Sequence, residues 1–213
     1  MRVELAGRMA LICGSAGPLA AAVAESLAAN GARVSRVAAT HVPAGPDLWD
    51  EAFLLVNVSR GAESLPDRDA PQIAATELAD FSQAARSLGQ AARDLAPGAK
   101  RVVNVISAAG LVPLRGAASF CAEQAGLATL TRALAMELAP QLVVNGAAVG
   151  AFSLEAGEPQ AARLLSHSAL QRPATAAEIM AAVLFLADPA NTYMTGHTLV
   201  VDGGWAAGYA RNF

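Results

Sequence analysis

Five residues have side chains that could act in catalysis, by their chemical type and their spacing in the sequence. Ser107 follows the apolar run RVVNVI, Cys121, Glu123 and Gln124 stand together further along, and His167 lies in a loosely patterned region. A hydroxyl near a carboxylate can exchange a proton with a substrate, as a cyclisation, dehydration or isomerisation requires. Ordinary roles are equally open: Glu123 as a solvated helix carboxylate, Ser107 as a strand-end hydroxyl bonded locally, and His167 as an exposed loop residue.

The elements that must position these residues alternate along the chain. Apolar runs of strand length are followed by Ala- and Leu-rich segments with helical spacing, the pattern of a parallel sheet covered by helices. The sequence therefore predicts one α/β domain over residues 1–213, without an internal repeat or linker. The expected strands are 8–13, 32–37, 53–57, 101–106, 142–147 and 197–201, and the expected helices are 19–30, 73–95, 118–138 and 174–187.

Composition excludes several classes of protein. Of 213 residues, 54% are hydrophobic and 15% charged, which is enough apolar surface for a full core and excludes a disordered chain. The formal net charge of −3 leaves no basic surface for nucleic acid, and no apolar run is long enough to span a membrane. The chain starts directly with a strand pattern, so we expect a cytoplasmic protein. Cys13 and Cys121 lack metal-binding spacing, so no metal is expected.

Motifs along most of the chain resemble those of one family. They are ALICGSAG followed by a helix and GARV, then RVVNVISAAGLVPL, FCAEQAGLATLTRALAMELAP, VVNGAAVGAF and RPATAAEIMAAVLFLADPANTYMTGHTLVVDGGW. Together they resemble the short-chain dehydrogenase/reductase family. The resemblance implies a Rossmann-type doubly wound parallel sheet, binding of NAD or NADP, hydride transfer to or from an alcohol or ketone, and association as dimers or tetramers. Here the fold is expected to be shortened between the family's second and fourth strands.

The resemblance also locates the family's catalytic positions. Ser107 matches the family's serine, but the tyrosine position, thirteen residues on, is Phe120, and the lysine position is Gln124. A phenyl ring carries no exchangeable proton, and a neutral amide cannot lower the pKa of a phenol by its charge. Neither tyrosine of the chain has a lysine four positions on, and the single lysine, Lys100, precedes the strand at 101–106. We therefore expect no working catalytic set at these degenerate positions.

The family's glycine-rich cofactor motif is altered in the same way. It stands here as Cys13-Gly14-Ser15-Ala16-Gly17-Pro18-Leu19-Ala20, and only its first glycine is in place. Pro18 removes an N–H group that could bind an anion, and Ala20 places a methyl group where the family has a close approach of backbone. The degenerate positions Cys13, Gly14, Pro18 and Ala20 predict that this chain binds no cofactor.

The leading hypothesis from the sequence is a catalytically inactive subunit. It would assemble with an active short-chain dehydrogenase paralogue as a heterodimer or heterotetramer and stabilise an NAD(P)-dependent alcohol or hydroxyacyl dehydrogenase. NAD(P) would then be bound only in the active partner. The helices at 73–95 and 118–138 and the segment 194–205, which form subunit interfaces in the family, retain the family's pattern.

Two further hypotheses stay open at this point. The first is a non-redox enzyme, a cyclase, dehydratase or isomerase that reuses the family's cleft with Ser107, Glu123 and Gln124. The second is a homomeric binding protein with weak affinity for a nucleotide or CoA, in which Arg60, Arg115 and Arg172 flank the cleft. A conventional dehydrogenase would be supported by turnover that disappears when Ser107 is changed to alanine.

Overall fold

A computed structural model describes residues 3–37, 50–63, 75–94, 100–152, 165 and 167–208. In this part of the chain, strands pair side by side in one parallel sheet of order β2-β1-β3-β4-β5-β6. The strands are β1 (Met9–Gly14), β2 (Arg33–Arg36), β3 (Ala52–Val58), β4 (Lys100–Ser107), β5 (Leu142–Val149) and β6 (Thr198–Val201). The predicted Rossmann-type doubly wound sheet is confirmed.

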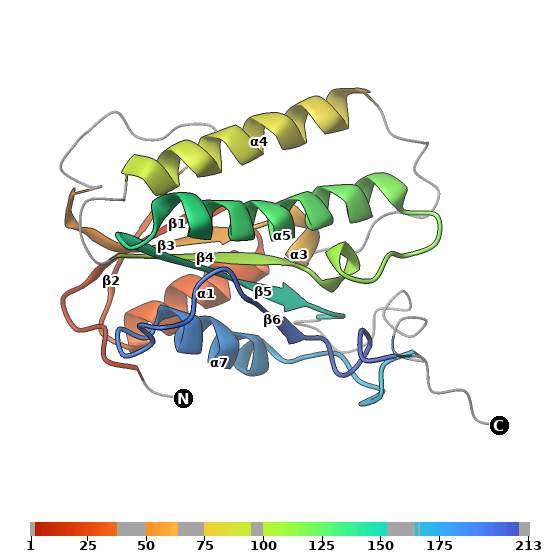
Figure 1. Cartoon of the computed structure of the whole chain (residues 1–213). Helices are drawn as coiled ribbons and strands as arrows, with labels where there is room; N and C mark the ends of the chain where they lie inside the picture. Colours follow the sequence, from red (N-terminus) through yellow and green to blue (C-terminus); the bar gives the residue numbers. More distant parts are fainter. Residues whose placement is uncertain are drawn as a thin grey trace.

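Helices cover both faces of the sheet (Figure 1). They are α1 (Pro18–Ala29) and α7 (Ala176–Ala187) on one face, and α4 (Ala75–Asp94) and α5 (Ala118–Leu138) on the other. Because both faces are covered, the central strands are buried almost continuously and mostly apolar, instead of alternating between buried and exposed residues. All eight residues of β4 are buried.

Each face has its own hydrophobic core. Leu19, Val23 and Leu27 of α1 meet Ile179 and Val183 of α7 against the sheet, each with no more than 1% of its surface exposed. On the other face the core is formed between α4 and α5 and includes Leu88, Ala92, Leu127 and Leu134. Apolar residues at helical spacing in these four segments thus account for the layered architecture.

The predicted elements agree with the observed ones to within one or two residues wherever both are described. Two differences matter for the site. The short helix α3 (Arg60–Glu63) was not predicted, because four residues are too few to show helical periodicity. The shortening expected between the second and fourth strands of the family falls on residues 38–49, which lie outside the described residues.

Helix α7 begins with a complete capping box. The Thr175 hydroxyl accepts a hydrogen bond from the Glu178 N–H at 3.3 Å, and the Glu178 carboxylate accepts one from the Thr175 N–H at 2.8 Å. Arg172 donates two further hydrogen bonds to the two Glu178 oxygens, at 2.6 and 2.9 Å. These bonds satisfy amide groups that a helix start leaves open, and they tie the preceding loop to α7.

Replacing Thr175 with alanine should lower the free energy of unfolding by about 1 kcal/mol, because the first turn of α7 loses its side-chain acceptor. Chemical denaturation of Thr175→Ala and wild type measures the difference. Thr192→Ala, at an exposed threonine outside any helix or strand, is the control and should leave the midpoint unchanged. Equal midpoints for Thr175→Ala and wild type would contradict the assigned cap.

The same cap makes stability depend on pH. Hydrogen bonds from Arg172 and then from Thr175 lower the pKa of Glu178 from 4.5 to about 2. A carboxyl group whose pKa is lower in the folded state stabilises the fold above its unfolded pKa, and loses that effect as pH falls through the folded value. The difference in Tm between wild type and Glu178→Gln should therefore be constant near neutral pH and shrink from about pH 4.5 to pH 2.

Glu178 is exposed, so solvent screening keeps this effect small. Glu25→Gln, at an exposed glutamate in α1, is the matched control, because it removes the same charge from a residue that takes no part in the α7 cap. A difference for Glu178→Gln that stays the same between pH 7 and pH 2 would contradict the prediction.

Candidate functional site

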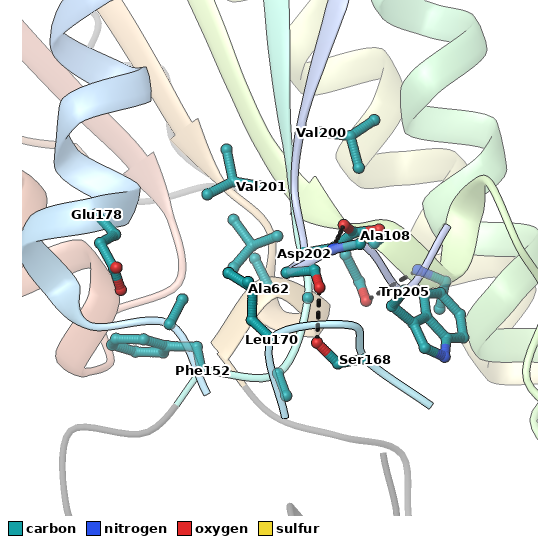
Figure 2. A pocket seen from close by; sticks show the side chains of 18 of the residues that line it. Ala62, Ala108, Phe152, Ser168, Leu170, Glu178, Val200, Val201, Asp202 and Trp205 are labelled. Atoms are coloured by element: carbon teal, nitrogen blue, oxygen red, sulfur yellow. Dashed lines mark hydrogen bonds between the residues drawn. The ribbon is translucent and has the colours of Figure 1, made fainter. Parts of the chain in front are cut away.

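A pocket of about 240 Å³ opens at the carboxyl ends of β4, β5 and β6 (Figure 2). Helix α3, the start of α7 and the segment after β6 complete its walls. In doubly wound sheets ligands bind at this edge of the strands. Residues that line the pocket include Ser107, Val149, Phe152, Val201, Asp202 and Trp205.

Ser107, which matches the serine of the family's catalytic set, lies in the pocket wall. It ends β4 and caps the short 3-10 helix Ala108–Gly110, where its hydroxyl oxygen accepts the Ala109 N–H at 3.3 Å. None of the described residues accepts the hydroxyl hydrogen of Ser107. That hydrogen is therefore available to an oxygen atom of a ligand in the pocket.

Gln124 lies behind Ser107 in the protein interior and does not line the pocket. Its Oε1 accepts two hydrogen bonds, from the Ser107 N–H at 2.8 Å and from the Ser59 hydroxyl at 2.9 Å. Its Nε2 is buried without a hydrogen-bond partner among the described residues. The side chain at the family's lysine position therefore ties together the ends of β3 and β4 from α5.

The other side chains expected at a site are placed elsewhere. Phe120 is half-buried and packs beside Cys121, whose sulfur accepts the Leu114 N–H at 3.2 Å. Glu123 is half-buried, His167 is exposed, and neither lines the pocket. Within the set Ser107, Cys121, Glu123, Gln124 and His167, a hydrogen bond joins Ser107 to Gln124.

The turn between β1 and α1 packs directly against the end of β3. Gly14 has a φ of +93°, and a Cβ atom there would collide with the Val58 carbonyl oxygen and lie 2.8 Å from the Asn57 side-chain oxygen. The Ser15 N–H also donates to the Val58 oxygen at 2.7 Å. Only glycine suits this position, since it combines the left-handed conformation with the close approach.

Cys13, immediately before this turn, is buried. Burial raises the pKa of its thiol from 9.0 to about 12. The group is therefore a neutral thiol at physiological pH and cannot act as a thiolate nucleophile.

A carboxylate occupies the start of α1. Glu63, the last residue of α3, accepts a hydrogen bond from the Ala20 N–H at 2.8 Å and another from the Ser15 hydroxyl. Ala20 itself is fully buried and belongs to the hydrophobic core between α1 and the sheet. Sequence reasoning missed Glu63, since a single glutamate after a non-periodic segment carries no signal.

In the described part of the chain, no helix combines the length and apolar character needed to cross a membrane. Among the same residues, no three side chains of histidine, cysteine, aspartate or glutamate gather as a metal site would require.

Comparison with known proteins identifies relatives of this chain. The family profile described as enoyl-(acyl carrier protein) reductase matches residues 63–206. A galactitol 2-dehydrogenase of Cereibacter sphaeroides is 34% identical over 217 residues, which cover 93% of this chain and 85% of that protein. An uncharacterized short-chain type dehydrogenase/reductase of Sinorhizobium fredii is 32% identical over 240 residues, with 93% of this chain but 44% of that protein covered.

Solved structures share the fold. A doubly substituted variant of a Serratia marcescens short-chain dehydrogenase/reductase is 25% identical, with a TM-score of 0.78 and coverage of 95% of this chain and 99% of that one. A gluconate 5-dehydrogenase from Burkholderia cenocepacia, solved with NADP and tartrate, is 22% identical, with a TM-score of 0.80 and coverage of 97% and 98%.

These findings correct three expectations. The chain was expected to be a catalytically inactive subunit, not an enzyme by itself, and to bind no cofactor. All three are wrong: its relatives are named as dehydrogenases, and structures of its fold hold NADP or NADH. The same relatives do not favour the alternative hypothesis of a cyclase, dehydratase or isomerase.

The physical error lay in how the β1–α1 turn was interpreted. Ala20 was expected to obstruct an anion, but its methyl group is in the core while its N–H binds a carboxylate. Pro18 occupies the first position of α1, where proline is compatible with a helix start. The turn therefore retains the capacity to bind an anion.

The chain spans about half the length of several curated relatives that it matches, with 43 to 45% of three of them covered. The galactitol 2-dehydrogenase and the solved structures are matched over most of their length. The profile match over residues 63–206, the sequence relatives and the parallel sheet agree, and the chain belongs to the short-chain dehydrogenase/reductase family.

Proposed function

We propose that this chain is an oxidoreductase that uses NAD or NADP to interconvert a small alcohol and the corresponding carbonyl compound. The observation that carries the proposal is the placement of Ser107, whose hydroxyl hydrogen is available at the wall of a pocket at the carboxyl ends of β4 to β6. The anion-binding start of α1 adjoins that pocket through Glu63, which belongs to both.

The described residues are compatible with the dinucleotide that the family uses. The Glu63 carboxylate on the Ala20 N–H and the Ser15 hydroxyl acts as a stand-in anion and marks where a pyrophosphate would be held. The pocket beside Val149 and Gly150 would receive the nicotinamide end. When bound, the cofactor would supply or accept the hydride.

The side chains of this protein would hold the substrate oxygen and its proton. Ser107 can donate its hydroxyl hydrogen to that oxygen, and the Gln124 amide oxygen holds the Ser107 backbone in place. Phe120 lacks an exchangeable proton, so we assign it no part in proton transfer. The solvent reached through the open pocket would exchange the proton at Ser107.

The charges around the pocket favour an uncharged substrate. Arg172 and Glu178 line the rim but neutralise one another through two hydrogen bonds. The Asp202 carboxylate accepts the N–H groups of Gly204 and Ala206, at 2.8 and 2.7 Å. Much of the remaining wall is apolar and includes Leu114, Phe152, Leu170 and Val201. A small neutral alcohol suits these surroundings better than an organic acid.

Two expectations from the sequence stay predictions. One is association with an active paralogue as a heterodimer or heterotetramer, which the native mass of the complex after co-purification would test. The other is a cytoplasmic location, which cell fractionation would test.

Changing Ser107 to alanine should lower kcat/KM for the alcohol by about 10²-fold, because the oxygen that becomes negatively charged loses its hydrogen-bond donor. The measurement follows NADH and NADPH absorbance with a panel of small alcohols and ketones. Ser87→Ala, on α4, is the control. Unchanged turnover in Ser107→Ala would contradict the role of Ser107, and no turnover with any of the compounds in wild type would contradict the proposed function.

A lysine at position 124 should not restore a family-like site. Gln124→Lys should instead lower the free energy of unfolding by about 1–3 kcal/mol, because an ammonium group cannot accept the Ser107 N–H and the Ser59 hydroxyl. Urea denaturation and turnover are measured on the same preparation, with Gln83→Lys on the exposed side of α4 as the control. Higher turnover at unchanged stability would contradict the structural role of Gln124.

A further inference from the structure

Glu63 occupies the crevice where the strand order of the sheet reverses. In the order β2-β1-β3-β4-β5-β6, the chain moves outward in one direction from β1 to β2 and in the other from β3 onward, so the reversal lies between β1 and β3. Helix α3 follows β3 directly and carries Glu63 at its end. Ligands of doubly wound sheets bind at this reversal, and here it contains a side chain of the protein itself.

The fit of this carboxylate to the start of α1 is close. Besides its hydrogen bonds to the Ala20 N–H and the Ser15 hydroxyl, it lies where a Cβ atom on Gly17 would be. A Cβ atom at position 17 would require the Glu63 carboxylate to move. A negative group at a helix N-terminus is also stabilised by the helix dipole.

Two other hydrogen-bond donors of the turn have acceptors within the protein. The Gly17 N–H donates to the Ser15 hydroxyl oxygen at 3.2 Å, and the Ser15 N–H donates to the Val58 oxygen at 2.7 Å. Pro18 has no N–H. A pyrophosphate approaching this helix start would compete with Glu63 for the Ala20 N–H and the Ser15 hydroxyl, and would meet the repulsion of its negative charge.

We propose that Glu63 is a built-in competitor of the cofactor, whose carboxylate must leave the start of α1 before the pyrophosphate of NAD or NADP can bind. This inference rests on the proposed function and adds regulation of the same site. Because Glu63 also lines the pocket, its departure would leave the α1 turn open towards the pocket.

The release of Glu63 needs only a side-chain rotation. The backbone of α3 is held without help from the Glu63 side chain. The Ala62 N–H donates to two atoms of Ser59, the carbonyl oxygen at 3.0 Å and the hydroxyl oxygen at 3.2 Å. The Ser59 hydroxyl in turn donates to Gln124. The helix that carries Glu63 is thus held by contacts that do not involve the Glu63 side chain, and substitutions of Glu63 should leave the fold intact.

The test is the affinity for ADP-ribose, which carries the pyrophosphate but undergoes no redox reaction, measured by isothermal titration calorimetry in wild type and Glu63→Gln. If the carboxylate fills the turn about 90% of the time or more, its removal tightens binding by about 10-fold or more. Glu63→Asp, which keeps the charge but withdraws it by one methylene, should bind with intermediate affinity. Without ligand, Glu63→Gln should melt about 2–4 °C lower than wild type.

Glu25→Gln, also charge-neutralising but on the exposed side of α1, is the control and should bind ADP-ribose as wild type does. Equal affinities of Glu63→Gln and wild type, with binding observed in both, would overturn the competitor and leave the proposed function standing. If neither binds ADP-ribose, NADH or NADPH at millimolar concentration, the proposed function fails and the competitor with it.

Discussion

One buried amide oxygen, Gln124 Oε1, holds the two halves of the site together. It accepts the Ser107 N–H at the end of β4 and the Ser59 hydroxyl at the end of β3. Through Ser59 it also supports α3, and thereby the position of Glu63. Each bond contributes about 0.5–1.5 kcal/mol, but an unpaired donor in this interior would cost more than a made bond contributes. The orientation of Ser107 towards the pocket therefore depends on a residue that never touches a ligand.

The layered architecture makes that arrangement possible. Apolar cores on both faces of the sheet fix the strand ends, so that β1, β3, β4, β5 and β6 all terminate at one edge. The parallel sheet alone therefore brings the polar groups at those strand ends close together. The two regions of this edge differ in chemistry, since the α1 turn holds a carboxylate and the pocket beside Ser107 combines apolar with polar side chains.

The fold and part of the site could be predicted from the sequence. The apolar runs predicted the strands because burial on both faces leaves a continuous hydrophobic signal, and Ser107 was located because it directly follows such a run. The contacts of Gln124 and Glu63 could not be predicted, since they depend on how β3, α3 and α5 meet in space. The loss of cofactor binding was wrongly inferred from Cys13, Gly14, Pro18 and Ala20, because residue types alone do not reveal which backbone N–H groups remain at the helix start.

Because both cysteines are buried, their reactivity towards alkylating reagents reports local opening of the fold. Both are shielded by the fold, and the high pKa of the Cys13 thiol further slows attack by alkylating reagents. Modification of Cys13 consequently requires that the end of β1 open first, whereas modification of Cys121 requires opening at the start of α5. Timed alkylation followed by mass spectrometry would thus record the opening of the two regions separately, from an unlabelled protein. Since Cys13 directly precedes the β1–α1 turn, the chain carries a natural probe of occupancy there.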